Sequence, residues 1–429
     1  MAFGHLHGPP ASRPLRAVWR STLLILGALL AANAAAQSLS LDEALRRAED
    51  ANPRLRAAQA EAAALEGQLD DARALLWNNP TVAGEIGRRS VPNEARQREY
   101  LVGISQAFEI AGQQGYRREE AEQSLAAYRE EIGELRRQVR AEVSRRFLAV
   151  LALQTRIDTE RAVLKLTEDS SAVVDKRFRA GEDTRLQANL AEVEADRARN
   201  EVRSLEEQLV LTRAELATLL QLPPAELPAV RGELVASAPP YTLEQLLGTV
   251  NTRPQFRAFG HREEAARKRL ALERASVYPD VTLGVGTGRE GSSEARENLT
   301  LFTVSVPLPL FRRNATGIGR ASSDLTRTQI EREVALRDAR AQVTALWRTF
   351  ESLRTRVARL RGSVLPRLDE NQKLSQRALR AGEIGIAELL LVNRQLLDAQ
   401  RDFYAALTEY ETTRVTLEEA AGWTPEVKQ

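Results

Sequence analysis

Two stretches of the chain place an apolar residue at every seventh position, which is the pattern of helices packed as a coiled coil. In the later stretch these positions are Leu389, Leu396, Phe403, Tyr410 and Leu417. The positions 201 residues earlier are also apolar, namely Ala188, Ala195, Val202, Leu209 and Leu216. The other positions are rich in Arg and Glu, so the pattern predicts long helices that bury one narrow seam and expose the rest to water.

Glycine interrupts each helical tract once, near its middle, at Gly181 and Gly382. Because glycine adopts the left-handed conformation that reverses a chain after a helix, each tract is predicted to be a helical hairpin. No proline occurs between Pro92 and Pro223. The first arm, about 114–178, can therefore run unbroken for roughly 100 Å at a rise of 1.5 Å per residue.

Each half of the chain is predicted to begin with a helical segment, at about 41–76 and 243–276. Short segments that alternate apolar and polar residues lie between it and the long helical tract. In the second pair, about 279–310, the apolar positions are Val281, Leu283, Val285, Phe302, Val304 and Val306. The first pair, about 80–110, repeats the pattern with Val102 and Ile104. Polar turns join the two members of each pair, so the sequence predicts two β-hairpins, each with one apolar face.

These hairpins have two interpretations. They are surface features of a water-soluble helical protein, or they are outer-membrane strands with interfacial aromatic residues at Trp77, Tyr100, Tyr278 and Phe311. The length of the segments favours the interpretation as outer-membrane strands. Four strands cannot close a barrel, and an open edge in lipid leaves backbone groups unpaired. Several chains would therefore share one barrel, with eight strands from two chains or twelve from three. The pattern alone does not distinguish two chains from three.

The two halves of the chain also share four motifs, in the same order and at a spacing near 200. They are Leu39–Leu45 with Tyr241–Leu247, Asn52-Pro53 with Arg253-Pro254, Asn79–Val82 with Tyr278–Val281, and Arg179–Glu182 with Arg380–Glu383. The chain is interpreted as a tandem duplication. The first repeat is 37–222, a Pro-rich joint is 223–240, the second repeat is 241–423 and a tail is 424–429.

The N-terminal residues 1–36 have the order of a secretory signal peptide. Three arginines precede an apolar run at 22–30, and small residues follow as far as Ala36. We predict cleavage after Ala36. The apolar run is too short for a membrane-spanning helix, so an N-terminal membrane anchor is the less favoured alternative.

Residue types that most catalytic and metal sites need are missing. The chain has no cysteine, its one methionine is Met1, and the predicted mature chain keeps only His261 among the histidines. No catalytic site, metal site, cofactor or lipid-modified cysteine is therefore expected, and the protein is not predicted to be an enzyme. Lys+Arg 61 against Asp+Glu 59 gives a formal net charge of +2, which indicates no nucleic-acid partner.

The motifs resemble those of the TolC-like outer-membrane efflux proteins over nearly the whole predicted mature length. The residues that carry the resemblance are Leu41–Leu45, Asn52-Pro53, Ser105–Gly112, Arg179–Glu182, Pro307–Asn314 and Arg380–Ile384. The segment Pro307–Asn314 is most similar to the CzcC-like components of heavy-metal efflux systems.

The resemblance implies a mainly α fold with a small β part. Duplicated long helical hairpins would form an α-barrel in the periplasm, and four antiparallel strands from each chain would enter a shared, trimeric transmembrane β-barrel in outer-membrane lipid. The implied partners are two further copies of the chain, a periplasmic adaptor (membrane fusion) protein and a proton-driven inner-membrane RND-type transporter.

The expected function is therefore that of a passive outer-membrane channel in a tripartite efflux system, with heavy-metal cations as cargo. Drug or solvent efflux and type I protein secretion are the alternatives within this class. A periplasmic coiled-coil structural protein is the alternative outside it.

The resemblance also assigns the candidate site residues. The adaptor-docking tips fall on two turns made of Arg179, Ala180, Gly181 and Glu182, and of Arg380, Ala381, Gly382 and Glu383. Some family members carry two acidic pore residues just after the second tip. The first falls on Glu388 and the second on Leu391, so a double acidic ring is not expected. Three copies of Glu388 at the pore entrance would favour cations, and a solvated helix residue is the equal alternative.

Overall fold

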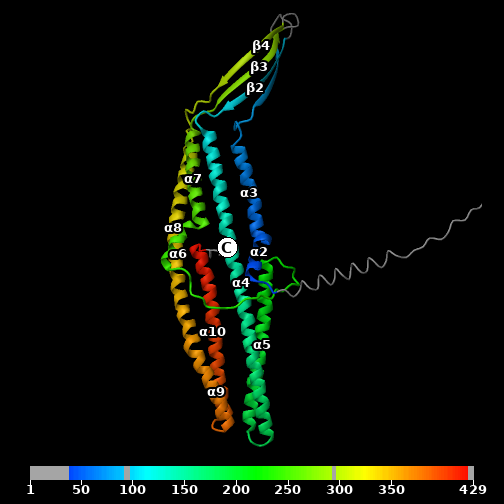
Figure 1. Cartoon of the computed structure of the whole chain (residues 1–429). Helices are drawn as coiled ribbons and strands as arrows, with labels where there is room; N and C mark the ends of the chain where they lie inside the picture. Colours follow the sequence, from blue (N-terminus) through cyan, green and yellow to red (C-terminus); the bar gives the residue numbers. More distant parts are fainter. Residues whose placement is uncertain (1–37, 91–96, 292–295, 424–429) are drawn as a thin grey trace, which may run out of the picture.

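The computed structural model describes residues 38–90, 97–291 and 296–423. Long helices run side by side, and a four-stranded sheet stands at one end of them (Figure 1). The predicted signal peptide and the tail at 424–429 lie outside the described residues. Among the described helices, none has both the length and the apolarity to cross a membrane.

The same order of elements occurs twice along the chain. The first set is α2 (Leu41–Ala51), α3 (Pro53–Ala72), β1 (Thr81–Arg89), β2 (Gln97–Phe108), α4 (Gln113–Arg179) and α5 (Arg185–Leu219). The second set is α6 (Leu243–Thr249), the 3-10 turn Val250–Thr252, α7 (Pro254–Ala275), β3 (Val281–Gly291), β4 (Arg296–Ser305), α8 (Ala315–Arg359), the π-helical turn Leu360–Val364, α9 (Leu365–Ala381) and α10 (Ile386–Ala421). The prediction of a mainly α fold with a small antiparallel β part is confirmed.

The longest helix matches the predicted first arm. Helix α4 has 67 residues, which corresponds to about 100 Å of length. The predicted seam is also present, because Leu389, Leu396, Tyr410 and Leu417 are all buried along α10. Apolar burial along one face of α10 therefore helps to hold the helices together.

The helical segments before the hairpins are shorter and more broken than predicted. The sequence predicted single helices at about 41–76 and 243–276. In the structure, Asn52 ends α2 and caps α3 by accepting a hydrogen bond from the Arg54 amide at 2.9 Å. Proline follows at the first position of both α3 and α7, where its missing N–H is not needed, so both prolines start new helices.

The first arm of the second hairpin is not a uniform α-helix. The π-helical turn Leu360–Val364 joins α8 to α9, and Pro366 is the second residue of α9. Proline cannot donate a backbone hydrogen bond and its ring crowds the preceding turn, so a locally wider turn accommodates it. The arm therefore stays helical across the only proline of that tract.

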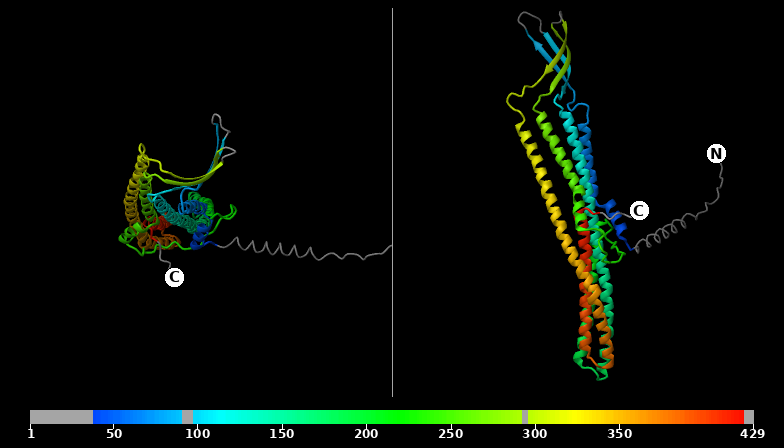
Figure 2. Two further views of the ribbon diagram at one scale, coloured as in Figure 1. Left: turned by 90° about the horizontal axis from the view of Figure 1, so that it is seen from above. Right: turned by 60° about the vertical axis from the view of Figure 1, so that its left-hand side comes forward.

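The sheet is antiparallel with the order β1-β2-β3-β4. Val82 pairs with Ile104, Ile104 with Val285, and Val285 with Phe302. Directly paired residues point to the same face, so these four side chains form one apolar row. Thr303 belongs to the opposite face, together with Gly284, Gly286 and Gly288 of β3. The predicted alternation is confirmed, and the sheet curves when seen from above (Figure 2).

Candidate functional site

Both predicted tip turns lie at the end of the molecule opposite the sheet (Figure 1). Gly181 follows α4 with φ 80°, and Gly382 follows α9 with φ 75°. After each glycine a backbone hydrogen bond of 2.9 Å closes the turn, from the Glu182 amide to the Arg177 carbonyl and from the Glu383 amide to the Ala378 carbonyl. The predicted left-handed glycine turns are confirmed.

Side chains hold the first tip in place. Thr184 and Gln187 form a reciprocal capping box at the start of α5, in which the Thr184 amide donates to Gln187 Oε1 at 2.8 Å. The Arg177 guanidinium also lies 3.1 Å from Asp183 and 3.5 Å from Glu182. Capping and ion pairing together fix the path of the chain from α4 into α5.

The second tip has fewer side-chain restraints. Helix α10 begins after Gly385, which has no side chain to cap it. Within the described residues, Arg380, Glu383 and Glu388 take part in none of the ion pairs, and α9 contains no buried residue. The two tips are therefore similar in backbone path and different in local restraint.

A small apolar cluster joins the two tips. Val174 of α4 and Ala191 of α5 pack with Ile386 and Leu389 of α10. The seven-residue pattern identified Leu389, but it gave no signal for Ile386 or Val174, because their contact depends on how the two hairpins lie together.

The structure places Glu388 on the surface of the first turn of α10. An acidic residue there interacts favourably with the helix N-terminus. Leu391, which takes the place of a second acidic residue, is 56% exposed in the single chain. Both side chains are therefore free to face a partner or a pore, and the role of Glu388 at the pore entrance stays a prediction.

A buried ion pair links the two halves of the chain above the tips. Glu160 of α4 is 1% exposed, and Arg401 of α10 donates to both of its oxygens, from Nε at 2.6 Å and from Nη2 at 2.9 Å. The hydrogen bond to Glu160 raises the pKa of Arg401 above its ordinary value. The sequence gave no signal for this pair, because its members are 241 positions apart.

A second charged network lies where α10 ends. Arg253 reaches Glu134 at 2.7 Å and donates to the Ala420 carbonyl at 2.7 Å. Burial would raise the pKa of Glu134, but hydrogen bonds from Arg137 and Arg253 outweigh burial and lower it. This network fixes the end of α10 against α4 and the start of α7.

Metal-binding chemistry is not apparent in the described residues. No group of three or more His, Asp or Glu side chains in that part of the chain is arranged to hold a metal ion. His261 contacts Gln123 through Nδ1 at 2.8 Å.

The sequence matches the family described as outer membrane efflux protein over residues 44–221 and 249–423. The chain therefore belongs to this family of outer-membrane efflux channels.

Known proteins are similar over most of the chain. The cobalt-zinc-cadmium resistance protein CzcC of Cupriavidus metallidurans is 23% identical over 388 residues, 90% of this chain and 91% of that protein. The pyoverdine export outer membrane protein OpmQ of Pseudomonas putida is 27% identical over 332 residues, 73% of this chain and 67% of that protein. The solved structure of CusC superposes with a TM-score of 0.74 at 15% identity, covering 89% and 91% of the two chains.

Proposed function

We propose that three copies of this chain form one channel that carries cargo from the periplasm across the outer membrane. The observation that carries the proposal is the open sheet. Strand β1 pairs only with β2 and β4 pairs only with β3 in the described chain, while one face of the sheet is apolar. Joining β4 of one copy to β1 of the next satisfies these edges and, with three copies, gives a closed barrel of twelve strands.

The helices would then form a periplasmic tunnel whose tips dock on an adaptor protein. The docking residues are the two tip turns Arg179–Glu182 and Arg380–Glu383, and Glu388 stands at the entrance. A proton-driven RND-type inner-membrane transporter would deliver cargo to this end. Export would follow signal-peptide cleavage after Ala36, without a lipid anchor, and the repeats would divide at the joint 223–240.

Heavy-metal cations are the favoured cargo, because the metal-resistance protein CzcC is similar over nearly the whole chain. The chain lacks cysteine, and soft metals are selected by thiolate, thioether or imidazole ligands. The channel would therefore pass cations without holding them, and selection would lie in its partners. The similarity to OpmQ, whose name states pyoverdine export, favours a second candidate, the efflux of organic molecules.

Cross-linking tests the shared barrel. The natural chain has no cysteine, so a Val82→Cys change combined with Phe302→Cys or Val304→Cys introduces the only thiols. Because Val82 and Val304 lie on opposite edges of one sheet, a disulfide between them should join neighbouring copies. We expect dimers and trimers on non-reducing gels. Only monomers, in a protein that fractionates with the outer membrane, would contradict the trimer.

Growth tests identify the cargo. A strain without the gene is grown across a panel of metals and drugs, with and without the gene restored. Sensitivity to cobalt, zinc or cadmium salts that the restored gene reverses would support metal efflux. Sensitivity to organic compounds alone would favour the second candidate.

A further inference from the structure

The Pro-rich joint between the two repeats crosses α4 and α10 and closes one side of a surface cavity (Figure 1). Its segment 232–236, which we call the joint strap, leads from the first half of the chain towards the second. Leu234 of the strap packs against the apolar cores of both halves. The strap therefore lies where the two repeats meet.

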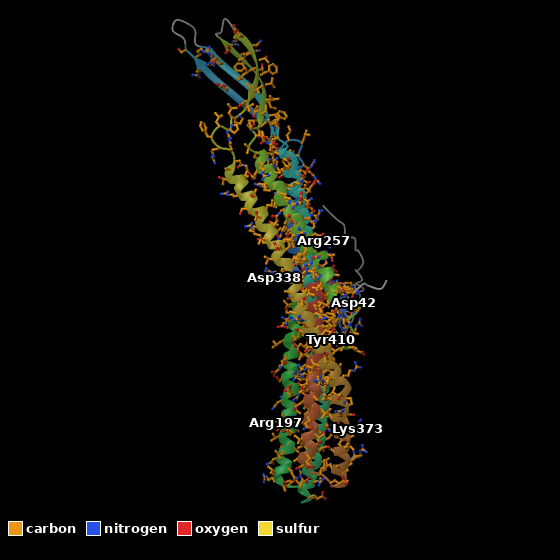
Figure 3. All side chains as sticks on the ribbon, turned by 90° about the vertical axis from the view of Figure 1, so that its left-hand side faces the viewer. Asp42, Arg197, Arg257, Asp338, Lys373 and Tyr410 are labelled. Atoms are coloured by element: carbon orange, nitrogen blue, oxygen red, sulfur yellow. The ribbon has the colours of Figure 1, made fainter. Side chains whose placement is uncertain are left out.

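Hydrogen bonds hold the joint on either side of the strap. Before it, the Val230 amide donates to Gln154 Oε1 at 3.1 Å, and Gln154 Nε2 donates to the Val230 carbonyl at 2.9 Å. After it, the Tyr410 hydroxyl donates to the Ser237 carbonyl at 2.5 Å. Tyr410 is a buried residue of α10 that lies between the sheet and the tips (Figure 3). The strap is thus fixed at its two ends to different halves of the chain.

The peptide groups of the strap itself are free. Across the described residues, the backbone of 232–236 forms no hydrogen bond. Leu234 and Ala236 pack against the core, whereas Glu233 and Val235 are exposed. This alternation is that of an extended chain. Its N–H and C=O groups therefore stand at the surface, where a ligand can reach them.

Helices α8 and α10 form further walls of the cavity, whose volume is about 390 Å³. Val357, Phe403 and Leu407 give these walls an apolar surface. Phe403 and its neighbour Tyr404 meet edge to face, with ring centroids 5.4 Å apart. Cavities of this size, with apolar walls and a few polar groups, are typical binding sites for small organic molecules.

One cationic side chain lines the same cavity. Arg361 lies in the π-helical turn between α8 and α9, and turns of this kind are frequent at functional sites. Within the part of the chain that the structure describes, its guanidinium takes part in no ion pair or hydrogen bond. Such a guanidinium can bind a carboxylate through two parallel hydrogen bonds. Glu233 of the strap also lines the cavity, so a second negative charge on a ligand would be repelled.

We propose that this cavity binds an organic anion that has one acidic group and an aromatic or other apolar body. Arg361 and the N–H groups of the strap hold the acidic group, and the body packs against Phe403 and Leu407. The ligand contacts the joint and the second helical hairpin together, so its binding stabilises their contact. A single chain forms the site, which therefore does not depend on the proposed channel.

Fluorine NMR of the purified full-length protein tests the site with para-fluorophenylacetate, which joins an aromatic ring to one carboxylate. Binding broadens the fluorine signal of this probe. We expect the wild type to bind it, and Arg361→Gln to weaken binding about tenfold, because a charge-assisted hydrogen bond is lost. The matched control is Arg359→Gln, which removes the same charge from an exposed residue of α8 that does not line the cavity. This variant should bind as the wild type does.

Two further probes separate the acidic group from the apolar body. Fluoroacetate has the carboxylate without the ring, and para-fluorobenzyl alcohol has the ring without the charge. Each should bind more weakly than para-fluorophenylacetate. Equally strong binding of the alcohol would overturn the anion site in favour of apolar association alone. No binding of para-fluorophenylacetate to the wild type would overturn the proposal, as expected if a neighbouring copy covers the cavity.

Hydrogen exchange followed by mass spectrometry tests the location of the probe. Saturating para-fluorophenylacetate should slow amide exchange at 232–236 in the wild type and in Arg359→Gln, but not in Arg361→Gln. Binding that leaves exchange of the strap unchanged would place the probe elsewhere on the protein and would overturn the proposal.

Discussion

At the scale of single residues, the two tip glycines have space around them but adopt a backbone conformation that other residues rarely take. No atom lies within 4 Å of the position that a Cβ would take at Gly181 or Gly382, yet both have φ near the left-handed value. A side chain there would not clash, and the left-handed conformation would cost about 1–2 kcal/mol. A change at these positions should therefore alter the surface of the tip while leaving the fold intact.

We expect Gly382→Phe to abolish efflux and leave the amount of trimer unchanged, because the bulky ring would obstruct adaptor docking. Growth on the toxic cargo measures efflux, and gel migration measures the trimer. The control is Gly67→Phe in α3, where a Cβ also meets nothing within 4 Å and no positive φ occurs. Normal efflux in the Gly382 variant would argue against docking at this tip.

A separate prediction concerns the Glu388 carboxylate and the ion selectivity of the channel. If three copies line the entrance, Glu388→Gln should reduce cation preference in bilayer recordings. A charge contact near 4 Å in water is worth about 1 kcal/mol, so the ratio of cation to anion permeability should fall roughly fivefold. Leu391→Asn, at the exposed position nearby, is the control for a change in polarity without loss of charge. Equal permeability ratios for the wild type and Glu388→Gln would identify Glu388 as a solvated helix residue.

At the scale of elements, α4 and α10 are joined by more than their apolar seam. The contact between Glu160 and Arg401 removes a carboxylate from water almost completely. Losing one partner of such a pair leaves an uncompensated buried charge, which is far more destabilising than losing an exposed pair.

Arg401→Gln should lower the free energy of unfolding by about 3 kcal/mol, measured by denaturant unfolding of the solubilised protein. The matched control is Arg161→Gln. Arg161 directly follows Glu160 in α4 and pairs with Glu206 in an exposed contact. That change should cost less than about 1 kcal/mol. A similar loss of unfolding free energy in both variants would show that the pair of Glu160 and Arg401 stabilises the fold no more than an exposed ion pair does.

The unequal tips predict unequal local stability. Helix α9 buries none of its residues, whereas α5 buries seven. Few buried contacts lower the free energy of local opening. Hydrogen exchange followed by mass spectrometry should therefore find faster exchange in 365–381 than in 185–219. Equal protection in both helices would mean that packing between copies covers α9.

At the scale of the whole molecule, the surfaces of the sheet and of the helices are suited to different surroundings. The helical end carries many exposed ion pairs, as expected in water, whereas the sheet exposes Val82, Ile86, Phe302 and Val304 on one face. Neither requirement is met by one chain alone. In the proposed channel, association of copies in lipid would satisfy both the apolar face and the open strand edges.

A pair of variants on adjacent residues tests which face meets lipid. Phe302→Arg should cost about 2–4 kcal/mol near the bilayer centre, and should reduce the heat-resistant trimer recovered from outer membranes. Thr303→Arg, on the opposite face of β4, should keep the trimer and change only conductance. Loss of trimer in both variants, or in neither, would contradict a lipid-facing row through Phe302.

Much of the fold was predictable because its signals are local and repeated. The seam from Leu389 to Leu417, the alternation around Val304 and the glycines at 181 and 382 each depend on periodicity or backbone preference. The breaks before Pro53 and at the π-helical turn were missed, because a proline permits several local solutions and packing selects one. For the candidate site, the tip turns were predictable but the cluster of Val174 and Ile386 was not.

The sequence by itself determined the long helical hairpins, the apolar face of the strands, their duplication and the absence of thiol chemistry, since each follows from residue type and spacing. Only the tertiary structure decided that Glu160 meets Arg401, that Arg253 fixes the end of α10, and that Asn78 meets Asp280 between two loops at the helical end of the sheet. The physical reason is that these contacts join residues far apart in the chain. Their energies depend on burial and distance, which periodicity does not encode.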